Sequence, residues 1–145
     1  MKRLVVLLFV VALILAACGG GGEQPSAPAE SGGAVTGDAA RGEALFKQAT
    51  IGGAPGCASC HSLQPGQKLV GPSLAGIATQ AEKIIASPDY KGKAKTVEEY
   101  LRESIVDPNA YVVEGFPPNV MYGNYGKDLS AQQIADLVAF LMTLK

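Results

Sequence analysis

The residues best suited to chemistry in this chain lie in one pentapeptide, Cys57-Ala58-Ser59-Cys60-His61. In the C-x-x-C-H pattern two thiols on one turn can each add to a vinyl group of a haem, and the adjacent imidazole then lies beneath the iron. A thioredoxin-like dithiol requires a preceding strand and a βαβ context, which the flanking sequence does not predict. Structural zinc requires four ligands, and the pentapeptide offers three. The pattern therefore favours one covalently attached haem c.

The sixth position of such an iron has several possible occupants. His61 is the only histidine in the chain, so ligation by two histidines is excluded, and Met, Lys, water or an empty position remain. Met121 follows the paired prolines Pro117-Pro118 in a loop rigid enough to hold a weakly bound thioether. Met142 lies beside an apolar helical stripe, where a methionine usually fills the core. We predict that His61 and Met121 are the iron ligands, the alternative being that Met121 only fills space.

The first residues of the chain resemble an export signal. Met1-Lys2-Arg3 precedes thirteen apolar residues, 4–16. As a helix these would extend only about 20 Å, less than the hydrocarbon core of a bilayer. The run ends in Leu15-Ala16-Ala17-Cys18, which resembles the lipobox of bacterial lipoproteins, the alternative being an ordinary signal peptide with an incidental cysteine. We expect cleavage after residue 17 and lipidation of Cys18, which would anchor the protein to a membrane surface.

The segment between this signal and the first expected helix is composed almost entirely of small and polar residues. Residues 19–37 are rich in Gly, Ser, Pro, Ala and Glu and cannot bury enough apolar surface to fold. We therefore expect a signal peptide over 1–17, a lipidated flexible tether over 18–37 and one folded domain over 38–145. Removing Lys2 and Arg3 leaves ten basic and thirteen acidic side chains, so nucleic acid is not an expected partner.

Three helices are predicted for the folded part. Asp38 can cap a helix that runs to about Ala49, and Gly42 within it would allow another backbone to approach closely. Thr96-Val97-Glu98-Glu99 is a capping box for a helix that should stop before Asp107-Pro108. Ser130-Ala131-Gln132-Gln133 is a second capping box, followed by a stripe of apolar residues at helical spacing, namely Ile134, Leu137, Val138 and Leu141.

The remaining stretches predict loops. Residues 50–72 carry many Gly and Pro residues, residues 73–78 suit one or two helical turns, and residues 79–95 are polar without periodicity. No stretch alternates as a half-buried strand does. The fold class is therefore all-α, with three main helices and long loops around one haem. Lys91, Lys93 and Lys95 in the polar stretch could dock an acidic partner or could simply be solvated.

With these residues in place, 38–145 resembles a class I monohaem cytochrome c. Gly42 and Phe46 resemble the family's first-helix pair, and Leu137 and Phe140 resemble the last-helix pair that packs across it. Gly71-Pro72-Ser73-Leu74 resembles the family's Gly-Pro-x-Leu. The resemblance implies that the carbonyl of Pro72 accepts a hydrogen bond from the proximal histidine and that Tyr111 lies beside the haem.

The stretch 101–121 is especially similar to two relatives, the cytochrome domain of some oxidase second subunits and the monohaem lipoprotein subunit of alternative complex III. This implies an electron carrier that makes and breaks no substrate bond, with redox protein complexes as its partners. It would link a quinol-oxidising complex to an oxidase or a photosynthetic reaction centre, outside the cytoplasm. The alternatives are a fixed subunit of a larger electron-transfer complex and a haem enzyme or gas sensor with an open sixth position.

Overall fold

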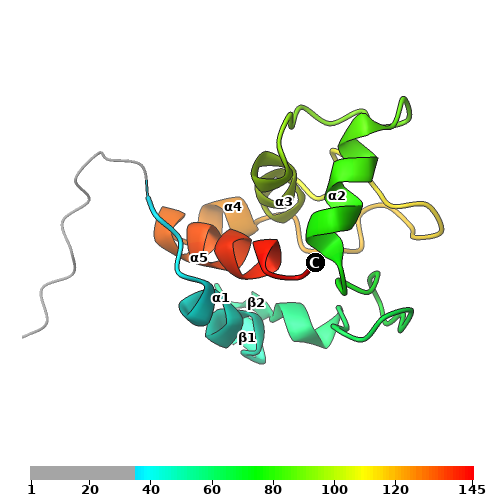
Figure 1. Cartoon of the computed structure of the whole chain (residues 1–145). Coiled ribbons are helices and arrows are strands. Elements are labelled where there is room, and N and C mark those ends of the chain that lie inside the picture. Colours follow the sequence, from blue (N-terminus) through cyan, green and yellow to red (C-terminus); the bar gives the residue numbers. More distant parts are fainter. Residues whose placement is uncertain (1–34) are drawn as a thin grey trace, which may run out of the picture. The chain divides into compact units, whose positions relative to one another are not determined.

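The computed structural model describes residues 35–145, and the expectations for the signal, Cys18 and most of the tether lie outside them. The described part is an all-α domain with a short hairpin (Figure 1). Its elements, in chain order, are α1 (Ala39–Phe46), β1 (Thr50–Ile51), β2 (Ala54–Pro55), the 3₁₀ turn η1 (Cys57–Ser59), α2 (Ile77–Ala86), α3 (Val97–Val106), α4 (Tyr125–Asp128) and α5 (Ala131–Met142). None of the helices in this part is long and apolar enough to cross a membrane.

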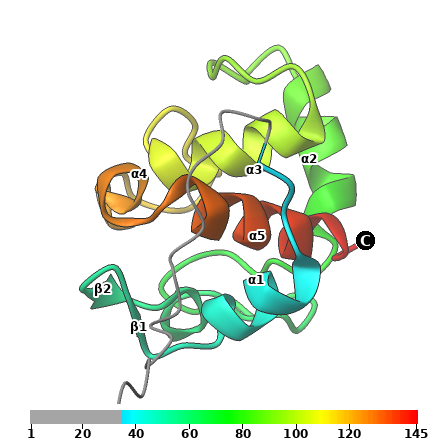
Figure 2. The same ribbon diagram turned by 90° about the vertical axis from the view of Figure 1, so that its left-hand side faces the viewer.

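The first and last helices cross at close range (Figure 2). A Cβ atom at Gly42 would overlap the carbonyl of Asp136, so only glycine allows the two backbones to approach this closely. Beside this point the rings of Phe46 and Phe140 pack with their centroids 5.4 Å apart and tilted by 55°. The close approach predicted for Gly42 is thus confirmed, and it joins two elements about a hundred residues apart.

A buried carboxylate fastens the start of the domain to α5. Asp136 is 4% exposed and accepts hydrogen bonds from the Asp38 backbone N–H at 2.7 Å and from Nε and Nη2 of Arg41 at 2.8 Å each. Gln132 Nε2 donates to the same carboxylate at 2.8 Å. The hydrogen bonds from Arg41 are the main reason why the pKa of Asp136 lies below its usual range. Asp136 is therefore ionised and fully bonded at neutral pH.

Both predicted capping boxes are present. The hydroxyl of Thr96 accepts from the Glu99 backbone N–H, and the Glu99 carboxylate reaches back to the Thr96 backbone N–H, both at 3.2 Å. Ser130 and Gln133 form the same reciprocal pair at the start of α5. The predicted stripe of α5 is buried, and Leu137 in its middle is 1% exposed. Helix α3 ends at Val106, as the following Asp-Pro predicts.

The predictions for two helices were wrong. Residues 77–86 form the ten-residue helix α2, although they were expected to be mostly irregular. This helix begins after Gly76, whose left-handed backbone (φ 69°) carries no side-chain cap, so the usual start signal is absent. Helix α1 ends at Phe46 instead of near Ala49, because the Ala49 carbonyl accepts from the Gly56 N–H at 2.8 Å and the chain turns into the hairpin.

That hairpin was not predicted either. Thr50 pairs with Pro55 and Ile51 with Ala54 in antiparallel register. The two connecting residues, Gly52 and Gly53, have φ angles of 55° and 79°, which suit a two-residue turn. Each strand has only two residues, which is too short for the alternation of apolar and polar residues that predicts a strand. The short helix α4 escapes prediction for the same reason, since it is a single turn.

Candidate haem site

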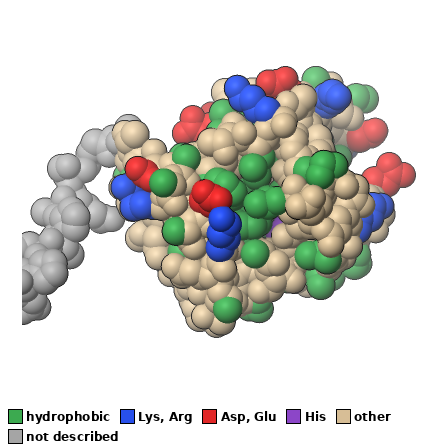
Figure 3. Space-filling model, turned by 60° about the horizontal axis from the view of Figure 1, so that its bottom comes forward, with side chains coloured by type: hydrophobic (Ala, Val, Ile, Leu, Met, Phe, Trp, Pro, Cys, Tyr) green, Lys and Arg blue, Asp and Glu red, His purple; other side chains and the backbone are tan. Residues whose placement is uncertain are grey.

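A cavity of about 520 Å³ occupies the middle of the domain, within the size range of ligand pockets. Helices α3 and α5, the turn η1 and the loops 62–76 and 107–124 contribute to its wall. Of the residues that the structure describes, those lining the cavity are mostly aliphatic and aromatic and include no Lys, Arg, Asp or Glu. On the face drawn in Figure 3, hydrophobic side chains gather around a hollow near the middle and charged side chains are scattered. The cavity is therefore suited to a large apolar group.

The turn η1 brings the two thiols and the imidazole to one wall of this cavity. The carbonyl of Cys57 accepts the backbone N–H groups of both Cys60, at 3.1 Å, and His61, at 2.9 Å. Both cysteines are unpaired and partly buried, and both line the cavity. Burial raises the pKa of Cys57 to about 11, whereas redox dithiols depend on a lowered thiol pKa. This opposes the thioredoxin-like alternative.

The imidazole of His61 is held by its Nδ1 atom. Nδ1 lies 2.9 Å from the carbonyl oxygen of Pro72, which can only accept, so Nδ1 carries the proton. This is the contact that the family resemblance implies. Burial lowers the pKa of His61, so the ring is neutral and its Nε2 lone pair is free. Within residues 35–145 no hydrogen bond engages Nε2. Such an arrangement of one fixed and one free nitrogen is typical of a metal-ligating histidine.

The backbone of Gly71 packs directly on the His61 ring. A Cβ atom at this position would lie 2.5 Å from Cε1 and 2.8 Å from Nδ1 of the imidazole. The N–H of Gly71 donates to the Cys60 carbonyl at 2.9 Å, which fixes this approach. The sequence places Gly71 next to Pro72 in a family motif, but its steric role in orienting the imidazole becomes visible only in the fold.

Met121 reaches the same cavity from the loop 107–124. Met142 does not line the cavity, and neither does any lysine of the described residues. Among residues 35–145, Met121 is thus the only thioether on the cavity wall, as expected from the sequence argument that separated the two methionines. No group of three or more His, Cys, Asp or Glu side chains between residues 35 and 145 is arranged to hold a metal ion, so the zinc alternative lacks a ligand set there.

Three tyrosines pack against one another at one end of the cavity. Tyr111 and Tyr100 both line the cavity, and the Tyr90 ring contacts each of them edge-on, with centroids 5.5 Å and 5.9 Å away. Tyr90 donates its hydroxyl to Glu103, and that carboxylate also accepts the Lys93 N–H at 2.7 Å. Burial is the main cause that raises the pKa of Tyr90 to about 12. Tyr111 was predicted to lie here, whereas the roles of Tyr90 and Glu103 were not, because no short motif connects them.

The residues present fit a covalently bound haem. The cavity is apolar and of sufficient volume, and two unpaired thiols lie on its wall beside a histidine whose free nitrogen has no protein partner among the described residues. All six candidate haem-binding residues line this one cavity, namely Cys57, Cys60, His61, Pro72, Tyr111 and Met121. The lipidation candidate Cys18 lies outside the described residues.

Comparison with known proteins identifies the family of the domain. The family model described as Cytochrome c matches residues 39–145. The chain is 35% identical over 114 residues to the cytochrome c2 of Blastochloris viridis, with 74% of this chain and 79% of the relative covered. It is 33% identical over 124 residues to a cytochrome c2 of Rhodopseudomonas palustris, with 74% and 99% covered. The chain thus belongs to the cytochrome c family, as a class I electron carrier with one covalently bound haem c and not an enzyme.

Proposed function

We propose that the protein is an exported, lipid-anchored carrier of single electrons between membrane complexes. In this proposal residues 1–17 are removed, Cys18 carries the lipid, residues up to 37 form the tether, and the domain from residue 38 binds the haem. The donor is a quinol-oxidising complex, and the acceptor is an oxidase or a photosynthetic reaction centre. The proposal combines the haem site with the signal and lipobox pattern, which the described residues do not include.

Within the site, we propose that Cys57 and Cys60 would hold the haem through thioether bonds and that His61 and Met121 would ligate its iron. The observation that carries this assignment is that all four side chains line one apolar cavity. In it, Nδ1 of His61 is fixed by Pro72, and Nε2 has no hydrogen-bond partner among the described residues. When bound, haem c supplies a one-electron couple of the iron. The protein holds the imidazole in one tautomer, presents a neutral sulfur and excludes charge, which together favour the reduced state and a relatively positive potential.

The ligand assignment is tested by replacing each methionine separately in protein matured with covalent haem. Met121→Ala should abolish the sulfur-to-iron charge-transfer band and lower the reduction potential, because the thioether that favours the ferrous state is gone. Met142→Ala is the matched control, since Met142 lies outside the cavity, and it should keep the band. A Met121→Ala protein with the parental spectrum would remove Met121 from the proposal.

The anchor is tested on the full chain expressed with its own signal in a bacterium that matures both lipoproteins and cytochromes c. The parent should fractionate with membranes and show a mass that includes lipid and haem. Cys18→Ser should release haem-containing protein into the soluble extracytoplasmic fraction, because two or more acyl chains are what makes lipid anchoring stable. Parent protein that is soluble and lacks lipid would reduce the proposal to a soluble carrier.

A further inference from the structure

Tyr125 connects the two segments of the chain that carry the candidate haem ligands. It is the first residue of α4, four positions after Met121, and it lines the cavity while being 6% exposed. Its hydroxyl donates a hydrogen bond to the carbonyl oxygen of Pro55, which precedes Cys57 by two positions and also lines the cavity. One buried side chain thus joins parts of the chain that are 70 residues apart.

The acceptor of this hydrogen bond belongs to backbone with little freedom to move. Pro55 is the last residue of β2 and pairs with Thr50 in the hairpin. The N–H of the next residue, Gly56, donates to the Ala49 carbonyl at 2.8 Å. The turn η1 begins directly afterwards with Cys57. The carbonyl of Pro55 is therefore held at a fixed place relative to the turn that carries the cysteines and the histidine.

Packing holds the donor against the same hairpin. A Cβ atom at Gly52, in the hairpin turn, would lie 3.0 Å from Cβ of Asp128, so the turn lies against the last residue of α4. Tyr122, the neighbour of Met121, contacts the Tyr125 ring edge-on with centroids 5.0 Å apart. Its hydroxyl donates to Asp128 at 2.7 Å. The residue next to the methionine is thus tied to the tyrosine that reaches across to the hairpin.

The hydroxyl of Tyr125 remains a donor at neutral pH. Burial, and to a smaller extent the nearby Cys57 and Cys60, raise the pKa of Tyr125 to about 12. The phenol is therefore protonated, whereas the Pro55 carbonyl can only accept. The bond does not depend on pH in the range in which His61 and the carboxylates titrate.

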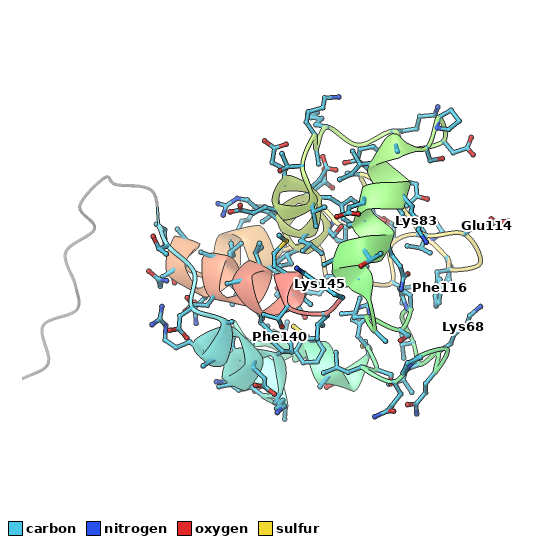
Figure 4. All side chains as sticks on the ribbon, in the orientation of Figure 1. Lys68, Lys83, Glu114, Phe116, Phe140 and Lys145 are labelled. Atoms are coloured by element: carbon cyan, nitrogen blue, oxygen red, sulfur yellow. The ribbon has the colours of Figure 1, made fainter. Side chains whose placement is uncertain are left out.

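The two ligand-bearing segments also meet at an exposed contact. Nζ of Lys68 lies 5.7 Å from the centroid of the Phe116 ring, and this contact joins the loop 62–72 to the loop 107–124 (Figure 4). Lys68 is exposed, and a cation–π contact is weak at an exposed site because water competes for the ammonium group. The bond of the buried Tyr125 is sheltered from this competition, so we expect it to contribute more to the connection.

We propose that Tyr125 is a positioning residue for the sixth iron ligand: through the Pro55 carbonyl it sets the position of Met121 relative to η1. This inference rests on the proposed ligand assignment and identifies what keeps the thioether in place. A ligand is held at its productive geometry by the side chains that support it. Without the Tyr125 hydroxyl the methionine side can shift away from η1, and an external ligand should then displace the thioether more easily.

The experiment titrates the oxidised holoprotein with imidazole, which competes with the thioether for the iron. Tyr125→Phe removes one oxygen atom and keeps the ring. It should bind imidazole roughly fivefold more tightly than the parent, the equilibrium equivalent of one net hydrogen bond. Its reduction potential should be lower, because the thioether favours the reduced state. Parental imidazole affinity in Tyr125→Phe would overturn the proposal.

Three control variants separate positioning from a general structural role. Tyr122→Phe loses a hydroxyl whose acceptor, Asp128, lies on the same side of the cavity, so imidazole affinity should stay parental. Asp136→Asn weakens the crossing of α1 and α5 and reports what reduced global stability alone does to imidazole binding; it should also stay parental. Lys68→Gln removes the exposed contact and should have a smaller effect than Tyr125→Phe. An effect as large as that of Tyr125→Phe in any of the three would overturn the proposal.

A measurement on the parent covers the case in which Tyr125→Phe does not mature. Nuclear magnetic resonance follows the exchange of tyrosine hydroxyl protons with water in the holoprotein. The proton of Tyr125, buried and bonded to the Pro55 carbonyl, should exchange more slowly than that of the exposed Tyr122. Equal exchange rates would show that the bond does not persist in the holoprotein and would overturn the proposal.

Failure of the proposed function has a different signature. A parental charge-transfer band in Met121→Ala would overturn the ligand assignment, and with it the role of Tyr125 toward that ligand. A lost band in Met121→Ala together with parental imidazole affinity in Tyr125→Phe would overturn the role of Tyr125 alone. Membranes that exchange no electrons with the holoprotein would contradict its role as a carrier and would leave both of these results unchanged.

Discussion

Two segments of the chain bring the candidate ligands to the cavity: the turn and loop 57–72 carry His61, and the loop 107–124 carries Met121. The segment that carries His61 makes more hydrogen bonds than the one that carries Met121. On the histidine side, backbone bonds join Gly71 to Cys60 at 2.9 Å and Leu74 to Ser62 at 2.8 Å. Side-chain bonds add Ser62 to Gln67 at 2.7 Å and Ser73 to the Gln64 carbonyl at 2.7 Å. The imidazole thus sits in a densely bonded segment.

The methionine side has few such bonds. Those within the loop 107–124 are two backbone bonds, Ala110–Asp107 at 3.0 Å and Phe116–Val113 at 3.2 Å, and one bond from the Asn119 N–H to the Asn109 side chain at 2.8 Å; the Tyr122 hydroxyl also donates to Asp128 of α4 at 2.7 Å. This loop depends instead on backbone restriction. It contains paired prolines, a glycine with φ 85° at residue 115 and a left-handed Asn119 with φ 63°.

The contrast suggests a division of tasks between the two ligands. A histidine fixed by hydrogen bonds keeps its tautomer and orientation in both oxidation states, whereas a thioether on a lightly bonded loop can be released at modest cost. The methionine side should therefore open at lower free energy than the histidine side, since local opening follows the density of backbone bonds and contacts. Substitutions at three places test this, ordered by the size of the expected effect, and the first is paired with its matched change on the methionine side.

The largest effect is expected from adding one methyl group on the histidine side. Gly71→Ala would place a Cβ atom 2.5 Å from Cε1 of His61, so either the ring or the backbone must move. Overpacking of this kind costs up to about 3 kcal/mol. We expect a lower free energy of unfolding in denaturant and a perturbed spectrum of the bound haem, because the imidazole loses its orientation.

The matched change on the methionine side is Gly115→Ala. No atom lies within 4 Å of a Cβ at this position, so the cost is limited to the positive φ, about 1 kcal/mol. Its spectrum should remain that of the parent. If Gly115→Ala perturbed ligation more than Gly71→Ala did, the methionine side would be the more tightly specified one and the comparison would be reversed.

Gly71 and Gly42 show what the sequence could and could not predict. The pentapeptide and the two capping boxes are short-range patterns. The residues of each pattern lie within five positions of one another, so all three can be recognised in the sequence. The contact of Gly71 with an imidazole ten residues away, and that of Gly42 with α5, depend on how the chain folds back. Of these, the sequence indicated only that some backbone would approach Gly42.

Helix α2 illustrates the other limit. Its buried residues Ile77, Ala78 and Ala81 include two alanines, so the apolar stripe is narrow and looks polar in a sequence window. Its backbone is supported by tertiary contacts such as the bond from the Ala78 N–H to the Leu144 carbonyl at 2.9 Å. Tertiary contacts of this kind stabilise a helix whose sequence has only a weak helical preference, and they cannot be recognised from the local sequence.

A smaller effect is expected where both sides of the cavity share one support, the crossing of α1 and α5. Asp136→Asn removes the charge that binds Arg41 and should lower the free energy of unfolding by about 1–2 kcal/mol at neutral pH. The pKa of Asp136 is lower in the folded state than in the unfolded chain. The ionised carboxylate therefore contributes its full stabilisation above the pKa of an unfolded aspartate, about 4. This stabilisation is lost as the pH falls through the lower pKa of the folded state.

The difference between parent and Asp136→Asn should therefore shrink below about pH 4, as measured by denaturant unfolding at a series of pH values. Loss of the charge-transfer band should follow global unfolding equally in both proteins, since the crossing supports the two ligand loops alike. A variant that released the methionine selectively would show that α5 controls one side of the cavity alone.

The smallest effect is expected from the side-chain bond that joins Asn109 to Asn119 in the methionine loop. Asn109→Ala removes the acceptor of the Asn119 N–H, which costs about 1 kcal/mol for a bond of this kind. Asn119 precedes Met121 by two residues, so the loss of stability should be confined to the methionine loop. The charge-transfer band should therefore disappear at a lower denaturant concentration or temperature than in the parent, while the midpoint of helix unfolding changes little. Asn109→Asp keeps an acceptor and should restore the parental behaviour of the band. In the described part of the chain, Asn109 makes no hydrogen bond with the histidine side. If Asn109→Ala lowered the midpoint of band loss and the midpoint of helix unfolding equally, the two loops would open together, and the unequal distribution of hydrogen bonds would have no consequence for ligand release.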